Sequence, residues 1–211
     1  MASRFLSRKN SKDPGRVLPG RDEPVDISGR HLVLSTSMVE PFPDHTEQLI
    51  VGMGCFWGVE RLFWTMDGVH TTAAGYAGGT TRNPTYEETC TGLSGHTEAV
   101  LIVYDPAQVS LEQLLKTFWE NHDPTQKDRQ GNDVGSQYRS ALFASSEEQL
   151  ESIRASVEKY QSILTESGFS KIETEVGMAA EFYYAEEYHQ QYLAKNPNGY
   201  CNHGFCQVAY S

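Results

Sequence analysis

The chain has 211 residues, 38% of them hydrophobic, with four cysteines and a formal net charge of −11. This length is enough for one domain with a sizeable core and short for two. The acidic balance, without a stripe of Lys and Arg, excludes a general nucleic-acid or anionic-membrane surface, because both require clustered positive charge.

Neither a membrane span nor a secretory signal is expected. No apolar run approaches the roughly 18 residues that cross a bilayer. Arg4, Arg8 and Lys9 are not followed by the apolar run of a signal sequence. We therefore expect a soluble cytoplasmic protein with no membrane or nucleic-acid partner, in which cysteines indicate reactivity and not structural disulfides.

Residues 1–46 are rich in Pro, Gly, Ser and charge, with only a short apolar patch at 32–34. Such a composition predicts an irregular N-terminal extension, which we expect to lie over the domain. The domain itself is predicted to cover residues 47–195. Residues 196–211 are predicted to form a C-terminal tail.

The first predicted strand, residues 49–54, runs directly into a helical pattern that follows Cys55. Phe56, Val59, Phe63 and Met66 give this helix an apolar stripe. A thiol at a helix N-terminus feels the positive end of the macrodipole and free N–H donors, which both lower its pKa. The sequence therefore predicts a reactive thiolate, against the alternative of a small buried core residue.

Two further strands are predicted at residues 71–77 and 98–104, the second ended by Asp105-Pro106. Ser110 with Gln113 forms a capping box that begins the next helix. The buried stripe of this helix consists of apolar side chains at helical spacing: Leu111, Leu114, Leu115, Phe118 and Trp119.

A polar loop over residues 130–137 leads into a strand at 138–144. Ser145 with Glu148 is interpreted as a second capping box, for a long helix that runs to about Ser167 and is ended by Gly168. One more strand near 172–176 and a helix near 185–195 complete the domain. This order of strands and helices predicts an α+β fold, a two-layer α/β sandwich.

The tail carries a second pair of cysteines, Cys201 and Cys206, among residues that favour turns. Pro197, Gly199 and Gly204 mark irregular chain, which we expect to change shape. Two thiols in such a tail suit a disulfide relay that begins at Cys55.

Motifs in a fixed order resemble the peptide methionine sulfoxide reductases of the A type. They are Gly-Cys-Phe-Trp-Gly at 54–58, Gly-Tyr-Ala-Gly-Gly at 75–79, Asn-Pro-Thr-Tyr at 83–86, Gly-His-Thr-Glu-Ala-Val at 95–100, Asn-His-Asp-Pro at 121–124, Gly-Asn-Asp at 131–133, Ser-Gln-Tyr-Arg-Ser at 136–140, His-Gln-Gln-Tyr-Leu at 189–193 and Gly-Tyr-Cys at 199–201. The resemblance implies a ferredoxin-like core and reduction of the S epimer of methionine sulfoxide, free or in oxidised proteins.

The resemblance also implies a thiol mechanism with no cofactor or metal, which repairs oxidative damage. Cys55 would attack the sulfoxide sulfur and Glu98 would protonate its oxygen, because hydroxide leaves poorly without a proton. Without the resemblance, Glu98 is an ordinary solvated strand end.

In the implied cycle Cys55 becomes a sulfenic acid, and Cys201 resolves it as a disulfide. Cys206 would then carry the disulfide outward to thioredoxin, so residues 47–195 would be catalytic and the tail redox-active. Only four residues separate Cys201 from Cys206, whereas three-cysteine members usually have a longer glycine-rich spacer. Their bridge is therefore expected to be strained and easily reduced.

Five further residues are candidates for the substrate pocket. Tyr86 and Tyr138 can donate hydrogen bonds to the sulfoxide oxygen, with packing as the alternative. Phe56 and Trp57 can hold the S-methyl group through sulfur–aromatic contact, and we expect Trp57 to be the more exposed. Asp133 either orients a water or polar group at the site or is a turn residue.

The rival hypothesis is a non-enzymatic zinc-binding or redox-sensing module formed by Cys201, His203 and Cys206 with His189. A general thiol–disulfide oxidoreductase is disfavoured, because such enzymes usually carry Cys-x-x-Cys and this chain has none. Cys90 has no evident partner in the sequence and is assigned to packing.

Overall fold

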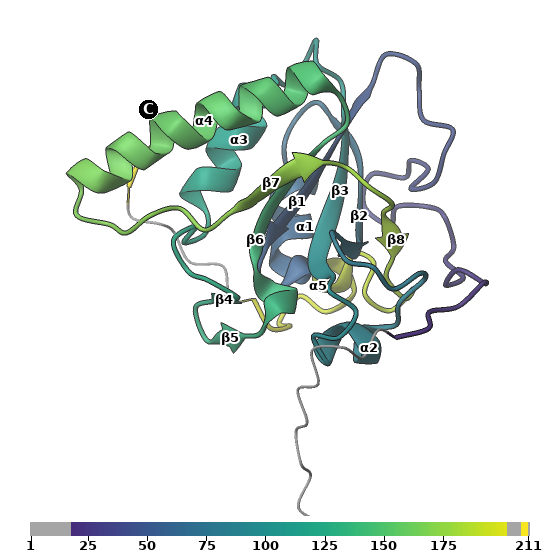
Figure 1. Cartoon of the computed structure of the whole chain (residues 1–211). Coiled ribbons are helices and arrows are strands. Elements are labelled where there is room, and N and C mark those ends of the chain that lie inside the picture. The colour runs from purple at the N-terminus through teal and green to yellow at the C-terminus, as the bar shows by residue number, and fades with distance from the viewer. Residues whose placement is uncertain (1–17, 202–207, 211) are drawn as a thin grey trace, which may run out of the picture.

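The structure, a computed structural model, describes residues 18–201 and 208–210. Within them a sheet of six strands has the order β7-β6-β1-β3-β2-β8 (Figure 1). Its strands are β1 (Glu47–Met53), β2 (Val69–Ala77), β3 (Thr97–Tyr104), β6 (Ser140–Ala144), β7 (Glu175–Met178) and β8 (Tyr183–Tyr184). The helices are α1 (Phe56–Trp64), α2 (Tyr86–Cys90), α3 (Leu111–Glu120), α4 (Glu147–Glu166) and α5 (Tyr192–Lys195), and β4 (Arg129–Gln130) pairs with β5 (Asp133–Val134) in a hairpin.

The sheet is mixed, and the predicted α+β fold is confirmed. β1 lies between β3 and β6 and is antiparallel to both, whereas β6 and β7 are parallel. Because successive side chains of a strand point to opposite faces, Leu49 and Val51 join one core cluster and Ile50 joins the other.

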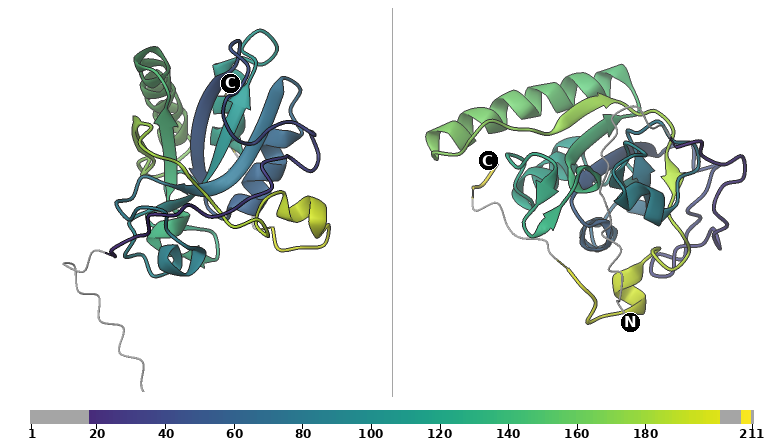
Figure 2. Two further views of the ribbon diagram at one scale, coloured as in Figure 1. Left: turned by 90° about the vertical axis from the view of Figure 1, so that its right-hand side faces the viewer. Right: turned by 60° about the horizontal axis from the view of Figure 1, so that its bottom comes forward.

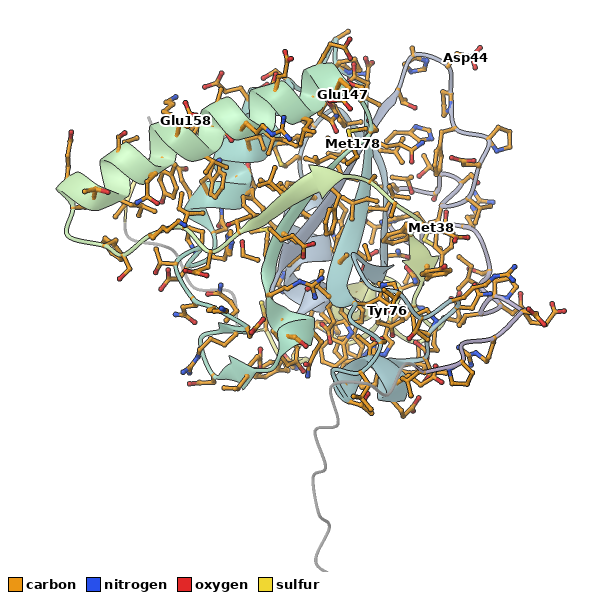
Figure 3. All side chains as sticks on the ribbon, in the orientation of Figure 1. Met38, Asp44, Tyr76, Glu147, Glu158 and Met178 are labelled. Atoms are coloured by element: carbon orange, nitrogen blue, oxygen red, sulfur yellow. The ribbon has the colours of Figure 1, made fainter. Side chains whose placement is uncertain are left out.

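Helices α1, α3 and α4 contribute side chains to the first core cluster, beside those of the strands. Each burial of a large apolar side chain contributes about 1.5–3 kcal/mol, so this cluster is the main source of stability. Its helical members include Phe56, Val59, Phe63, Leu114, Phe118, Trp119, Leu150, Ile153 and Tyr160. Glu147 and Glu158 lie on the exposed side of α4 (Figure 3).

The described part of the N-terminal extension packs on the domain. Met38 is fully buried in the second core cluster (Figure 3). His31 Nε2 lies 3.0 Å from Thr72 Oγ1 on β2, and the backbone N–H of Leu32 donates to Gln191 Oε1 at 3.1 Å. The extension therefore lies over the domain as expected, while its boundary at residue 46 stays a prediction.

Several element boundaries match the prediction. Helix α1 directly follows Cys55, and β2 and β3 include the two strands predicted after it. The capping box at Ser110 is present, with Ser110 Oγ accepting from the backbone N–H of Gln113. Gly168 ends α4 at a φ of +81°, a left-handed conformation that glycine adopts without steric cost.

The predicted capping box at Ser145 and Glu148 is wrong by one residue. Ser146 is the N-cap of α4, and its hydroxyl accepts from the backbone N–H of Gln149. The Gln149 side chain instead reaches back to the N–H of Ser145 at 2.9 Å. Adjacent serines, each with an acidic or amide residue three positions later, cannot be distinguished by pattern alone.

Two predicted strands also differ in their boundaries. The strand predicted from residue 138 begins at Ser140, because Ser136–Tyr138 forms a 3₁₀ turn. The strand predicted near 172–176 is β7, at Glu175–Met178, where it pairs with β6.

The helix predicted over 185–195 is confined to α5, because tertiary hydrogen bonds hold the residues before it. The Gln190 side chain bonds to both the N–H and the carbonyl of Ala74 on β2. The N–H of Gln191 donates to Glu60 at 2.8 Å, and Gln191 has a φ of +45°, which is not helical. A periodicity argument cannot detect bonds of this kind.

Candidate active site

The candidate nucleophile lies where β1 turns into α1, at the lower end of the sheet in Figure 1. Gly54 makes this turn at a φ of +90°, and a Cβ there would lie 2.6 Å from Gln130 Cβ. Only glycine fits both the backbone and the space, so the turn holds Cys55 at the N-cap of α1. The backbone N–H of Trp57 favours the Cys55 thiolate, although the Cys55 side chain makes no cap hydrogen bond.

Glu98 shares this helix terminus. It points from β3 to the same face as Val100, beneath α1, and its side chain is buried. The backbone N–H of Phe56 donates to Glu98 Oε2 at 3.0 Å. Burial, together with the charge of Asp133, raises the pKa of Glu98 to about 8 and outweighs this hydrogen bond. Glu98 therefore holds a proton at neutral pH, as an acid requires.

The expectation of a lowered thiol pKa at Cys55 is wrong for the resting site. Burial raises the pKa of Cys55, and the charge of Glu98 raises it further, while the N–H of Trp57 opposes both. The residue is 7% exposed, so desolvation of the thiolate exceeds the effect of the helix terminus. When Glu98 is protonated, the repulsion from its charge is removed.

Tyr86 and Tyr138 lie close enough to Glu98 for its charge to act on both. Burial first, and then the Glu98 charge, raise the pKa of each phenol, so both remain hydrogen-bond donors. Tyr86 begins α2 behind a complete capping box of Thr85 and Glu88. Both rings are half-buried, as expected for walls of a pocket that opens to solvent.

Asp133 lies at the same site, on β5, and its charge acts on both Cys55 and Glu98. Tyr200 donates its hydroxyl to Asp133 Oδ1 at 3.0 Å. This bond fastens the residue before Cys201 to the hairpin of β4 and β5. Sequence reasoning did not single out Tyr200, because the chain has eleven tyrosines and this one lies in an irregular tail.

Phe56 and Trp57 form an aromatic wall beside Cys55. Phe56 is 1% exposed, whereas Trp57 is half-buried and is the more exposed, as expected. The Trp57 ring stacks on Tyr192 with centroids 3.8 Å apart. Its Nε1–H donates to His189 Nδ1 at 3.0 Å, which fixes the indole plane.

Glu186 is a site residue that sequence reasoning missed. It accepts the hydroxyl of Tyr76 at 2.8 Å and the backbone N–H of Tyr86 at 2.9 Å. Tyr76 lies at the end of the sheet near α2 (Figure 3) and pairs with Glu98 in the register of β2 and β3. Glu186 thus ties α2 to the sheet. Its segment was predicted as a helix, which gave no signal of this role.

The described cysteines are all free thiols. Cys201 is exposed, and Arg61 Nη2 on α1 donates to its sulfur at 3.3 Å. Cys206 lies outside the described residues. The packing role assigned to Cys90 is wrong, because Cys90 is exposed and forms a hydrogen bond with Tyr86.

The zinc alternative is not favoured. Two of its ligands, His203 and Cys206, lie outside the described residues. His189 already uses Nδ1 to accept from Trp57, and its ring is buried among aromatic side chains, with centroids 4.9 Å from Phe56 and 4.7 Å from Tyr86. In the described ranges, no three His, Cys, Asp or Glu residues gather in a way that could hold a metal ion.

Comparisons with known proteins agree with this geometry. Residues 47–209 match the family described as peptide methionine sulfoxide reductase. A protein of Rhodospirillum centenum (strain ATCC 51521 / SW), named peptide methionine sulfoxide reductase MsrA, is 57% identical over 93% of this chain and 90% of its own. The human mitochondrial peptide methionine sulfoxide reductase is 53% identical over 94% of this chain and 84% of its own. The solved structure of methionine sulfoxide reductase A of Corynebacterium diphtheriae superimposes with a TM-score of 0.83, at 44% identity and 98% coverage of both chains.

Proposed function

Because this chain belongs to the peptide methionine sulfoxide reductase family, we propose that it reduces the S epimer of methionine sulfoxide through Cys55 and Glu98. One observation carries the assignment of residues: the thiol of Cys55 and the carboxyl of Glu98 meet at the N-terminus of α1. A nucleophile for sulfur and an acid for oxygen are the two groups that sulfoxide reduction requires.

In the first step the Cys55 sulfur attacks the sulfoxide sulfur while Glu98 protonates the oxygen, and the Glu98 carboxylate takes up the proton that the Cys55 thiol releases. Glu98 Oε2 accepts from Phe56, which leaves the other carboxyl oxygen to carry the proton toward the substrate. The Tyr86 and Tyr138 phenols stabilise the oxygen as its charge grows. The oxygen passes to Cys55 as a sulfenic acid, the methionine sulfur gains two electrons, and methionine leaves.

In the second step the Cys201 thiol attacks the Cys55 sulfenic acid. A disulfide forms between the two sulfurs, and the oxygen leaves as water. Cys201 is suited to this role because it is exposed and is held against α1, where Arg61 donates to its sulfur. Cys206 then exchanges with the disulfide and releases Cys55.

A dithiol protein of the thioredoxin class would supply the two electrons that close the cycle. Thioredoxin has a reduction potential of about −270 mV and reduces accessible disulfides. The substrates would be free methionine sulfoxide and oxidised proteins.

In the described ranges no helix is long and apolar enough to cross a membrane. The cytoplasm remains our proposed location, and fractionation of cells would test it.

The test is methionine formation from each sulfoxide epimer, with thioredoxin, thioredoxin reductase and NADPH as the recycling system. We expect turnover of the S epimer alone. Cys55→Ser should abolish it, because serine at this position cannot take up the oxygen as a sulfenic acid.

Cys201→Ala is the matched variant for the second step. It should form one methionine per chain and then stop, since the sulfenic acid has no resolving thiol. If Cys201→Ala turned over repeatedly with thioredoxin at the rate of the unaltered chain, the relay through Cys201 would be excluded. If Cys55→Ser kept its activity, Cys55 would be excluded as the nucleophile.

A further inference from the structure

The described end of the chain returns to the domain and is seated against α3 and α4 (Figure 2). Tyr210 is only 3% exposed, and its backbone N–H donates to Glu120 Oε1 at 2.8 Å. The hydroxyl of Tyr160 on α4 donates to the carbonyl of Val208 at 2.9 Å. Two helices therefore offer matched polar groups to two tail residues, Val208 and Tyr210, and we call this site the seat.

The ring of Tyr210 is held as well as its backbone. It lies 5.8 Å from the ring of Tyr160, and Lys159 Nζ lies 4.0 Å from its centroid, a cation–π distance. Tyr160 is fully buried, so an empty seat would leave its buried hydroxyl without this carbonyl acceptor. The seat is thus built into the helices and is not an incidental surface contact.

The resolving cysteine lies between this seat and a second fastening. Tyr200 bonds to Asp133, and Cys201 accepts from Arg61, so the tail is also held beside Cys55. Seven peptide units join Cys201 to Val208, and they can span at most about 25 Å. While Tyr210 is seated, Cys201 therefore cannot lie more than about 25 Å from Val208.

We propose that Tyr210 is a positioning residue for the recycling half of the reaction, an inference that rests on the proposed function. The seat keeps Cys201 at a high effective concentration near the Cys55 sulfenic acid. Effective concentration falls as about the −3/2 power of tether length, so doubling the free length lowers it about threefold. These hydrogen bonds and ring contacts of Val208 and Tyr210 are with α3 and α4 and include no candidate site residue, so we expect the first step to be independent of the seat.

The experiment compares the two halves of the cycle in Tyr210→Ala. The first half is measured as methionine formed in a single turnover without reductant, and we expect its rate to match that of the unaltered chain. The second half is measured as the time during which dimedone traps the Cys55 sulfenic acid, and as the steady rate with thioredoxin. We expect the trapping time to lengthen, and the steady rate to fall, by about threefold.

Two controls separate positioning from stability. Tyr210→Phe keeps the ring under Lys159 and should preserve recycling, whereas Tyr160→Phe removes the donor to Val208 without changing the tail and should lengthen the trapping time. A general loss of stability would slow both halves alike and would overturn the inference, as would an unchanged trapping time in Tyr210→Ala. Absence of the first turnover in the unaltered chain would instead reject the proposed function.

Discussion

At the scale of single residues, the site combines two groups that oppose each other's ionisation. Glu98 and Cys55 are both buried, and the charge of the carboxylate raises the pKa of the thiol. Such a pair titrates as a unit, and its first proton leaves at the pKa of about 8 at Glu98. Below that pH the carboxyl holds the proton that the acid donates, and above it the pair is left with a carboxylate and a thiol.

We expect the rate of the first turnover to be steady up to about pH 8 and then to fall, because Glu98 loses the proton that it donates. In Glu98→Gln the rate should be lower by the 10²–10⁴-fold that general acid catalysis typically supplies. The break near pH 8 should also disappear, since only the thiol still titrates. Stopped-time assays of methionine formation across pH 6–9.5 would check this, and a break retained in the variant would place the acid elsewhere.

The sequence predicted the reactive pair but not the residues that hold it. Cys55 follows an apolar strand that runs into a helix, which local pattern detects, whereas Glu98 was identified only through the motifs that resemble the family. Glu186 and His189 act through hydrogen bonds to Tyr86 and Trp57, about 100 and 132 positions away in the chain. Bonds over such separations leave no periodicity, so only the folded structure identifies them.

At the scale of elements, helix ends were predicted better than short segments. The capping box of Ser110 with Gln113 and the glycine at 168 act through neighbouring residues. The start of α3 and the end of α4 therefore follow from the sequence. β7 and α5 are each four residues long and depend on pairing with β6 or packing against α1. Their positions are set by partners that are distant in the chain.

Ser146 and Ser145 offer a direct test of the helix start. Ser146→Ala should lower the free energy of unfolding by about 1 kcal/mol, because it removes the acceptor for the N–H of Gln149. Ser145→Ala is the matched control and should cost less, since the Gln149 side chain bonds to the backbone of Ser145, which alanine retains. Urea denaturation of both variants would decide, and equal losses would contradict the assignment of the cap.

At the scale of the whole molecule, Glu60 connects distant parts of the fold from within α1. It is fully buried and accepts from both the backbone and the side chain of Gln191, and from Thr72 at 3.4 Å. Gln191 in turn contacts Met38 and Leu32 of the N-terminal extension. The extension, the sheet and the segment before α5 therefore meet at one carboxyl.

Burial raises the pKa of Glu60 from 4.5 to about 7, which links stability to pH. The unfolded chain releases this proton first, so the stability that the group contributes is complete below pH 4.5 and is lost as pH rises through about 7. Between pH 5 and pH 8 this loss amounts to about 2–3 kcal/mol.

Glu60→Gln should therefore reduce the decline in the free energy of unfolding between pH 5 and pH 8 by about 2–3 kcal/mol, whatever its effect at a single pH. Glu158→Gln on the exposed side of α4 is the matched control and should leave the decline unchanged. Urea denaturation at both pH values is the measurement. Identical declines in the unaltered chain and Glu60→Gln would reject the linkage.

The contacts that α1 makes with residues 189–201 also determine when the pocket can be completed during synthesis. Trp57, Glu60 and Arg61 bond to His189, Gln191 and Cys201, all of which follow the last strand of the sheet. The ribosome delivers the chain from its N-terminus at about 5–20 residues per second, and a domain folds as a unit. The sheet and α1 are therefore synthesised before the residues that orient the Trp57 ring and before the resolving thiol. The nucleophile is translated well before the residues that complete its site and regenerate it.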